Sequence, residues 1–415
     1  MYRPENLSID GTCYLGRWNK IVPVYDVFTM HGFNAIVGCV KHNNAEYGTV
    51  LYRGQTNLHE KLIPSILHGN PSDEEIESRQ NTVNTCIDKI LNDKLMQTTL
   101  HFGKDLDDRI NYKRIVIEAM LQHYGVRTHC QDFVDNHWTA LWFGLYELRK
   151  SREQGQTSRT NYYNYYYVKR KCFSKIEREK PASLEIQHPK YFELPSEPEY
   201  EDETDPSFFQ SAAYRNIESI ENEKVREEQL QQAHQKRIMI IKNRNSRKRR
   251  KWEEHTERLK KKNEDLLERY NKNMKSNIEY AYLLLYVADT RGDCFRGVYA
   301  GTETSTIDLR KALPSVILRP CAQHGWVVKK LSSDNDLSMK VACVLRIEVA
   351  LVNQMLGDGD LVKQKNFFPS VDEDSGYRIL LGREKIAPFG KPKAKKKKDL
   401  PALFEYSTFQ HYVNK

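Results

Sequence analysis

Residues 121–145 read LQHYGVRTHCQDFVDNHWTALWFGL, and this stretch contains the end of one helix and the start of the next. The preceding residues 109–122 carry apolar side chains at helical spacing, and Gly125 is a typical residue for the C-cap of that helix. After a polar turn, Asp135-Asn136 offers natural N-cap side chains. One apolar helix face then follows at positions i, i+3, i+4 and i+7, with Trp138, Leu141, Trp142 and Leu145.

Short apolar runs on both sides of this stretch predict a sheet. We expect strands at 33–41 (FNAIVGCVK), 48–52 (GTVLY) and 280–289 (YAYLLLYVAD), a turn into a strand at 319–330, and a strand or helix at 342–352. A further helix is expected at 73–100. Interleaved helices and strands of this kind predict an α+β body with a mixed sheet.

The middle of the chain has a different composition. Residues 211–275 contain neither Gly nor Pro and are rich in Glu, Lys, Arg and Gln, which favours a long helix or a helical pair. The apolar positions show no sustained heptad pattern, so a strong coiled coil is not expected. We therefore predict a protruding helical arm inside a divided body. The four parts are the N-terminal half of the body (1–150), a tyrosine-rich loop and charged helical insertion (151–276), the C-terminal half (277–390) and a Lys-rich tail (391–415).

The net charge of +9 is unevenly distributed. Residues 221–275 hold 18 Lys and Arg against 10 Asp and Glu, and residues 391–399 hold six Lys against one Asp. The rest of the chain is slightly acidic, so basic character belongs to two local tracts. Such tracts can bind nucleic acid, although a mixed-charge helix is more often a solvated face or an arm that binds a protein partner.

Several classes of protein are not favoured by the sequence. A chain with 24 Tyr, 15 Phe and 5 Trp is too aromatic to be disordered throughout. No apolar run approaches the ~20 residues of a membrane helix, and the N-terminus lacks a signal-peptide core. Eight scattered cysteines without a Cys-x-x-Cys pair favour a reducing, cytoplasmic setting and give no zinc spacing. We expect no metal and no membrane partner, and the motifs of P-loop nucleotide hydrolases, serine hydrolases and zinc proteases are absent.

Polar residues interrupt apolar ones at three places that could carry chemistry. Arg53 ends a strand, and a buried guanidinium needs a partner. It could form a structural ion pair with Asp132, or it could hold a phosphate or ribose, with Gly54 letting the backbone approach the ligand. His123 could act as a general base or simply cap a helix, and Thr128 or Gln323 could contact a ligand or satisfy a turn. We predict that Arg53, Asp132 and Gln323 converge in one pocket.

Taken together, these clusters resemble the FRG domain, named for a Phe-Arg-Gly motif. Tyr52 stands where that family has its naming Phe, and the long insertion is extra. The resemblance rests on four blocks: Tyr52-Arg53-Gly54-Gln55; Leu62-Ile63-Pro64-Ser65; Leu121 to Gly125 with Thr128, Asp132 and Ala140 to Phe143; and Arg319, Gln323 and Gly325.

FRG domains look like distant relatives of the ADP-ribosyltransferase fold, in which the Gly of a strand-ending Arg-Gly holds the nicotinamide amide of NAD. A Glu normally orients the ribose there, and Gln323 is its counterpart in this sequence. A neutral amide supplies less stabilisation of a cationic transition state. The resemblance implies catalytic roles for Arg53, His123 and Gln323, and contacts to NAD or another nucleotide from Tyr52, Gly54, Gln55, Tyr124, Thr128, Asp132 and Arg319.

Two functions are open at this point. The first is an enzyme that binds NAD or another nucleotide and transfers or cleaves ADP-ribose, which by analogy would suit a bacterial or phage-related toxin or anti-phage effector. The second is a non-catalytic module that recognises a protein or nucleic-acid partner through the pocket and the basic helical insertion. Gln323 in place of Glu favours the second function.

Overall fold

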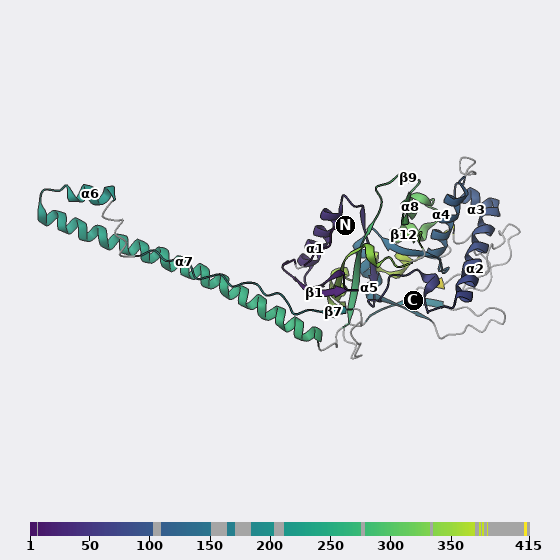
Figure 1. The fold of residues 1–415 in the computed structure, drawn as a ribbon, viewed down its shortest axis with the longest axis horizontal. Coiled ribbons are helices and arrows are strands. Elements are labelled where there is room, and N and C mark those ends of the chain that lie inside the picture. The colour runs from purple at the N-terminus through teal and green to yellow at the C-terminus, as the bar shows by residue number, and fades with distance from the viewer. Residues whose placement is uncertain are drawn as a thin grey trace. The chain divides into compact units, whose positions relative to one another are not determined.

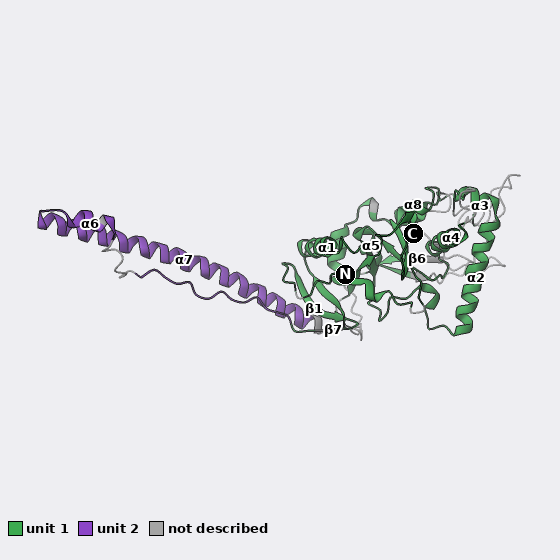
Figure 2. Cartoon of the chain, turned by 45° about the horizontal axis from the view of Figure 1, so that its top comes forward, with its two compact units in different colours: residues 1–188, 276–415 green, residues 189–275 purple. Residues whose placement is uncertain are grey.

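The computed structural model describes residues 1–5, 7–102, 109–150, 164–170, 184–202, 211–274, 279–332, 335–369, 373, 374, 376, 380 and 411–412. The chain divides into two compact units (Figure 2). Unit 1 comprises Met1–His188 and Ser276–Lys415, and unit 2 comprises Pro189–Lys275. Segments from both sides of the long insertion thus form one body, and the described residues 164–170 and 184–188 of the expected insertion belong to that body.

A mixed sheet dominates unit 1, which is an α+β body. In the described part of the chain, the sheet has eleven strands in the order β7-β1-β2-β13-β8-β3-β4-β12-β11-β10-β9. Strands β13 and β2 pair in parallel, and the other neighbours are antiparallel. The strands are β1 (Thr12–Trp18), β2 (Val22–Val27), β3 (Thr49–Gln55), β4 (Cys130–Val134), β7 (Leu184–Ile186), β8 (Tyr280–Ala288), β9 (Cys294–Phe295), β10 (Val298–Ala300), β11 (Thr304–Asp308), β12 (Gly325–Lys330) and β13 (Val341–Glu348). The predicted strands at 48–52 and 280–289, and the strand after the turn at 319–330, are confirmed.

Every residue of β8 is buried, as expected for a central strand covered on both faces. A smaller sheet joins β14 (His411–Tyr412), β6 (Asn164–Lys169) and β5 (Tyr146–Lys150). The segment 342–352, which was predicted as strand or helix, contains the end of β13 and then α10 (Val349–Leu356).

Side-chain caps begin three helices of unit 1 within the segments where the sequence predicts helices. Ser72 forms a capping box with Glu75 at the start of α2 (Asp73–Asn92), Asp93 caps α3 (Lys94–Thr99), and Asn136 caps α5 (His137–Leu145). The predicted helices at 109–122 and after Asn136 are therefore confirmed, and the single helix predicted at 73–100 forms as two helices, α2 and α3, that meet at Asp93 (Figure 1). The remaining helices of this unit are α4 (Ile110–His123), α8 (Leu309–Ala312), α9 (Leu318–Ala322) and α11 (Gln364–Phe367), with short 3-10 turns at Ser65–Leu67, Ser338–Lys340 and Asp360–Val362.

The strand predicted at 33–41 is wrong, because these residues lie in the helix α1 (Met30–Asn44). Thr29 caps this helix by accepting a hydrogen bond from the Gly32 backbone N–H at 3.0 Å. The buried side chains of this apolar run follow the period of a helix, which the length of the run does not indicate. The buried side chains fall at i, i+3, i+4 and i+7: Phe33, Ile36, Val37 and Val40.

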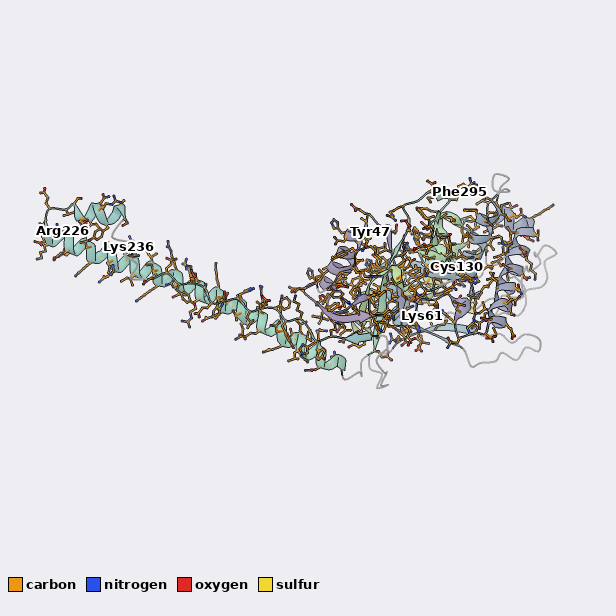
Figure 3. The ribbon with its side chains drawn as sticks, viewed as in Figure 1. Tyr47, Lys61, Cys130, Arg226, Lys236 and Phe295 are labelled. Atoms are coloured by element: carbon orange, nitrogen blue, oxygen red, sulfur yellow. The ribbon has the colours of Figure 1, made fainter. Side chains whose placement is uncertain are left out.

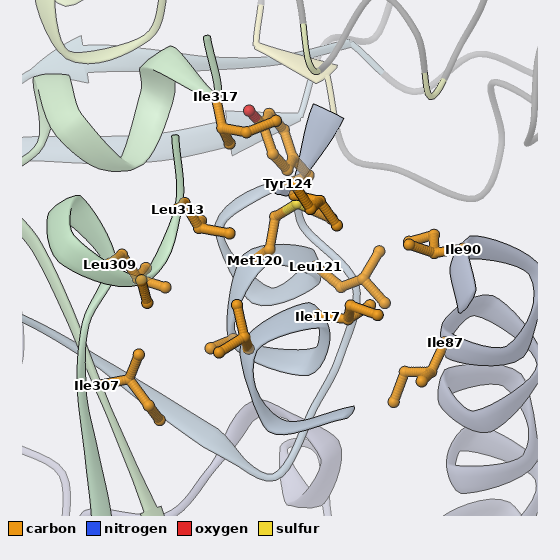
Figure 4. Packing of buried hydrophobic residues seen from close by; sticks show 14 of the residues in the cluster. Ile87, Ile90, Ile117, Met120, Leu121, Tyr124, Ile307, Leu309, Leu313 and Ile317 are labelled. Carbon is orange, nitrogen blue, oxygen red and sulfur yellow. The ribbon is translucent and has the colours of Figure 1, made fainter. Parts of the chain in front are cut away.

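The core of unit 1 is built from both halves of the chain. Figure 4 shows Ile117, Met120 and Leu121 of α4 packed between Ile87 and Ile90 of α2 on one side and Leu309, Leu313 and Ile317 on the other. Strand β8 pairs with β3 along seven residues, from Thr49↔Ala288 to Gln55↔Tyr282. Strand β12 pairs in the same way with β4. The strands β3 and β4, which carry FRG-like residues, thus each pair with a strand that lies more than 190 positions further along the chain.

Strands β3 and β4 themselves meet at one register position, Tyr52↔Val134. Beyond Tyr52 the two strands diverge, and the described residues continue no ladder between them. In an antiparallel strand alternate residues point their N–H and C=O groups to the same edge. At least one of Arg53, Gly54 and Gln55 therefore presents backbone groups at this opening.

Unit 2 contains the helical pair expected from its composition, with α6 (Ala212–Glu218) followed by the 52-residue α7 (Glu223–Met274). An extended segment, 189–202, which we call the strap, lies antiparallel along α7. Asn263 and Asn245 each bond both the backbone N–H and the C=O of one strap residue, Phe192 and Glu201 respectively, and Trp252 Nε1 donates to Pro195 O. Asn245 and Asn263 are 18 residues apart, about five helical turns, so they lie on one face of α7. In the described part of the chain, no helix has the length and apolar content that crossing a membrane requires.

Candidate functional site

The opening between β3 and β4 leads into a cavity of about 1140 Å³ in unit 1, which we call the FRG pocket. Pockets that bind small molecules commonly enclose ~300–1,000 Å³, so this one has room for a dinucleotide. Four kinds of wall surround it. They are the end of β3 (Tyr52 to Thr56), the loop 59–70, the polar group Gln122, His123, Asp132 and Gln323, and the aromatic side chains Phe143, Tyr146, Tyr167 and Phe368.

Arg53 bridges the two diverging strands. Its Nη1 donates to the backbone carbonyl of Asp132 at 2.6 Å, and with the Gln55 amide turned to suit, its Nε donates to Gln55 at 3.0 Å. No described carboxylate lies within ion-pair distance of this guanidinium. Burial lowers the pKa of Arg53, while Asp132 and Tyr167 oppose that change. The proposed ion pair with the Asp132 carboxylate therefore does not form, and Arg53 keeps donors for a ligand.

The carboxylate of Asp132 turns instead toward α4. Its Oδ2 accepts from Gln122 Nε2 at 2.8 Å, and its Oδ1 lies 3.5 Å from His123 Nε2. Gln122 is itself fixed by Thr128 Oγ1 and Ser65 Oγ, which donate to its Oε1 at 2.7 and 3.0 Å. The Asp132 side chain remains 40% exposed, so it presents negative charge to the FRG pocket.

Gln323 determines the tautomer of His123. Gln323 Nε2 donates to the carbonyl of Phe367 at 2.8 Å, so its Oε1 must be the atom that faces His123 Nδ1 at 3.1 Å. An amide oxygen only accepts, and Nδ1 therefore carries a proton. Both ends of the Gln323 amide are thus engaged within the protein.

It follows that a neutral His123 turns an unprotonated Nε2 toward Asp132 Oδ1. Both atoms are buried, and neither has a hydrogen-bond donor among the described residues. A proton on Nε2 would join them. Burial lowers the pKa of His123 and opposes that proton, Asp132 and Gln323 favour it, and Arg319 opposes it. The pair is therefore a site where charge can change inside the pocket.

The His123 ring packs directly against Gly325, where a larger residue would not fit. A Cβ at Gly325 would lie 2.7 Å from His123 Cε1 and 3.0 Å from His123 Nε2. The glycine of the fourth FRG-like block thus serves the packing of an imidazole.

Gly54 packs directly against the backbone of α5. A Cβ there would lie 1.6 Å from the carbonyl oxygen of Ala140 and 2.9 Å from the backbone N of Gly144. Gly54 is therefore required because α5 crosses β3 at close range. The protein fills the space where its Cβ would lie, and Gly54 also lines the FRG pocket, so its contact with a ligand stays a prediction.

Three predicted ligand contacts lie outside the wall of the FRG pocket. Tyr124 is fully buried and donates to Asp374 Oδ2 at 2.6 Å. Thr128 is also fully buried. Arg319 is 2% exposed, donates from Nη1 to the carbonyl of His123 at 3.2 Å, and stacks over the ring of Tyr124. These residues support the pocket from behind.

Tyr52 and Gln55 do line the FRG pocket. Tyr52 is 1% exposed, and its hydroxyl has no hydrogen-bond partner among the described residues. Burial raises the pKa of Tyr52 to about 12, with a smaller contribution from Asp135. The Tyr52 hydroxyl is therefore neutral, and it can donate or accept a hydrogen bond that no described residue of the protein provides.

Several lining residues were not predicted from the sequence. His59 and His68 flank the Leu62-Ile63-Pro64-Ser65 block, and burial followed by the charge of Arg53 lowers the pKa of His59. Tyr167 belongs to the tyrosine cluster of the expected insertion, and its ring stacks on Phe368 with centroids 4.9 Å apart. The cluster was visible in the sequence, whereas nothing around Phe368 signals its place in the pocket.

Among the described residues, no three His, Cys, Asp or Glu side chains are arranged to hold a metal ion. The seven described cysteines are all free thiols.

Comparison with known proteins identifies one part of this body. Residues 48–153 match the family model of the FRG domain. No curated protein and no solved structure matches the chain. The matched range contains β3, β4, α4 and α5, while Arg319, Gln323 and Gly325 lie outside it. Residues 48–153, which supply most of the walls of the pocket, are therefore an FRG domain.

Proposed function

We propose that the FRG pocket binds NAD or a related nucleotide. The observation that carries this proposal is the placement of the Arg53 guanidinium beside an aromatic wall in a cavity of dinucleotide size. Phosphate groups pair well with a guanidinium, and purine or nicotinamide rings stack on Phe and Tyr. The unpaired edge of β3 beyond Tyr52 would supply backbone groups for a carboxamide.

Calorimetric titration with NAD and ADP-ribose tests this proposal. We expect Arg53→Met to weaken binding about tenfold or more, because a hydrogen bond to a charged group is worth ~1.5–3 kcal/mol. The melting temperature should fall only modestly, since Arg53→Met removes the hydrogen bonds to the Asp132 carbonyl and to Gln55 but no ion pair. Lys94→Met is the matched control, because it removes an exposed cation at the start of α3 that does not line the pocket. Equal binding by wild type and Arg53→Met would reject the role of Arg53.

A second candidate, cleavage or transfer of ADP-ribose, is supported by Asp132. Its half-exposed carboxylate is a negative charge in the pocket that could stabilise an oxocarbenium-like transition state. Gln323 is a weaker candidate for that role, since both ends of its amide are already bonded. An enzyme that consumed NAD in this way would suit a toxin or anti-phage effector.

Release of nicotinamide and transfer of label from NAD separate the two candidates. Turnover that Asp132→Asn abolishes while NAD still binds would support the enzyme. Binding without turnover would support a recognition module. Absence of NAD and ADP-ribose binding by the wild type would reject both.

A further inference from the structure

The helix α7 carries a long tract of exposed cations. Residues 229–252 contain nine Lys and Arg and neither Asp nor Glu. Eight of the nine are exposed, and Arg237 is half-buried. Figure 3 labels Lys236, near the start of these cations on α7. Over 24 residues, this acid-free tract extends about 36 Å along the helix.

Repulsion between the cations of this tract destabilises the helix α7 itself. Residues three and four apart are neighbours on a helix surface, and like charges there destabilise it by about 0.2–0.5 kcal/mol for each pair. Within 244–251 five such pairs occur: Arg244/Arg247, Arg244/Lys248, Arg247/Arg250, Arg247/Lys251 and Lys248/Lys251. A local conflict of this kind is typical of a functional surface rather than of a spacer.

The strap relieves only part of this charge. Glu201 pairs with Arg244 at 3.4 Å and with Lys248 at 3.3 Å. At about 100° for each residue, Arg247, Arg250 and Lys251 lie roughly 100–160° around the helix from Asn245 and Trp252, which hold the strap. Arg250 reaches Glu254 at 3.6 Å, but both side chains are about 70% exposed, at 73% and 70%. An exposed pair of this kind contributes little.

We propose that this tract of α7, Lys236 to Lys251, binds the phosphate backbone of duplex nucleic acid. From Lys236 to Lys251 the cations extend about 23 Å along the helix, roughly two-thirds of one turn of duplex, ~34 Å. Protein interfaces are instead anchored by aromatic and apolar side chains and are poor in Lys. On this tract the large exposed apolar side chains are Met239 and Ile240. A row of exposed cations with few apolar anchors matches a polyanion better than a protein.

The test is fluorescence anisotropy of the full chain with 20-base-pair DNA and RNA duplexes between 50 and 200 mM KCl. The triple variant Arg247→Gln, Arg250→Gln and Lys251→Gln should lose affinity about tenfold or more. Its plot of log K against log salt should be shallower by about 3, since each lost phosphate contact removes ~0.9 from the slope. Helicity should be kept or increased, because like-charge pairs are removed, and circular dichroism measures it.

The matched control removes the same charge from the same helix outside the tract: Arg258→Gln, Lys260→Gln and Lys261→Gln. These cations lie among Glu257, Glu264 and Asp265, so the change should be less than about threefold. A variant with the opposite effect is Glu201→Gln, which should raise affinity by freeing Arg244 and Lys248. The proposal is overturned if the wild type binds neither duplex at 50 mM KCl, or if both triple variants lose affinity equally. Equally tight binding of a polyglutamate peptide would also overturn it.

Discussion

At the scale of single residues, Glu118 shows how this body uses a buried charge. Glu118 lies on α4 and is 4% exposed. It accepts from the backbone N–H of His129 at 3.1 Å and from Lys329 Nζ at 2.7 Å, and so ties α4 to β4 and β12. Burial raises the pKa of Glu118, but the hydrogen bonds from His129 and the charge of Lys329 outweigh it and lower the pKa to about 2.

This depressed pKa predicts a pH-dependent stability. The folded state holds the Glu118 proton less tightly than the unfolded state, so the contribution is present above about pH 4.5 and is lost as the pH falls toward 2. A difference of about 2.5 pKa units corresponds to about 3 kcal/mol. Glu118→Gln should therefore lower the free energy of unfolding by up to that amount at pH 7, and the difference should shrink steadily below pH 4.5. Urea unfolding across that range measures it.

Glu5→Gln is the control for this prediction. Glu5 pairs with Arg17 at 2.9 Å, but both side chains are about 40% exposed, at 42% and 40%. The control should change stability by less than about 1 kcal/mol. A flat difference between Glu118→Gln and wild type from pH 7 to pH 3 would contradict the assignment.

At the scale of elements, the crossing of α5 over β3 holds the FRG pocket open on one side. It depends on Gly54, whose Cβ position is taken by the backbone of α5. Gly54→Ala should therefore cost about 3 kcal/mol or more, because backbone atoms cannot yield as a side chain can. Gly38→Ala is the matched control, since a Cβ at this exposed position of α1 meets nothing within 4 Å and alanine favours a helix. Thermal melts should show Gly54→Ala well below wild type and Gly38→Ala at or above it.

The same elements show what the sequence could predict. Caps and helical stripes located α2, α4 and α5, and an unbroken apolar run located β8. The run 33–41 resembles a strand in the sequence, because a short apolar segment does not distinguish the period of a strand from that of a helix. The convergence of Arg53, Asp132 and Gln323 followed from polar residues placed among apolar ones. The role of Gly54 could not be predicted, since it depends on which helix crosses that strand.

At the scale of the whole molecule, the expected insertion is divided between two structural units: its first part belongs to the body, and its second part forms unit 2. Residues 164–170 belong to the body, because Arg170 is buried with its Nη1 donating to the carbonyls of Gly144 and Tyr280 at 3.1 and 2.8 Å. Tyr167 lines the FRG pocket. Residues 189–275 form unit 2, with the strap held along its own helix.

Two deletions follow from this division. Phe192 N and Asn263 Oδ1 are 2.8 Å apart, so removing 193–262 brings together ends that are already in contact, and a short Gly-Ser turn can join them. This protein should keep the melting temperature and NAD affinity of the wild type, because it retains every described residue of unit 1.

Removing 155–274 instead takes away Tyr167, Arg170 and the strands β6 and β7, which pair with β5 and β1. That protein should melt lower and bind NAD more weakly, since the partners of Arg170 lose a buried donor. Equal loss of stability in both deletions would mean that unit 2 supports the body after all.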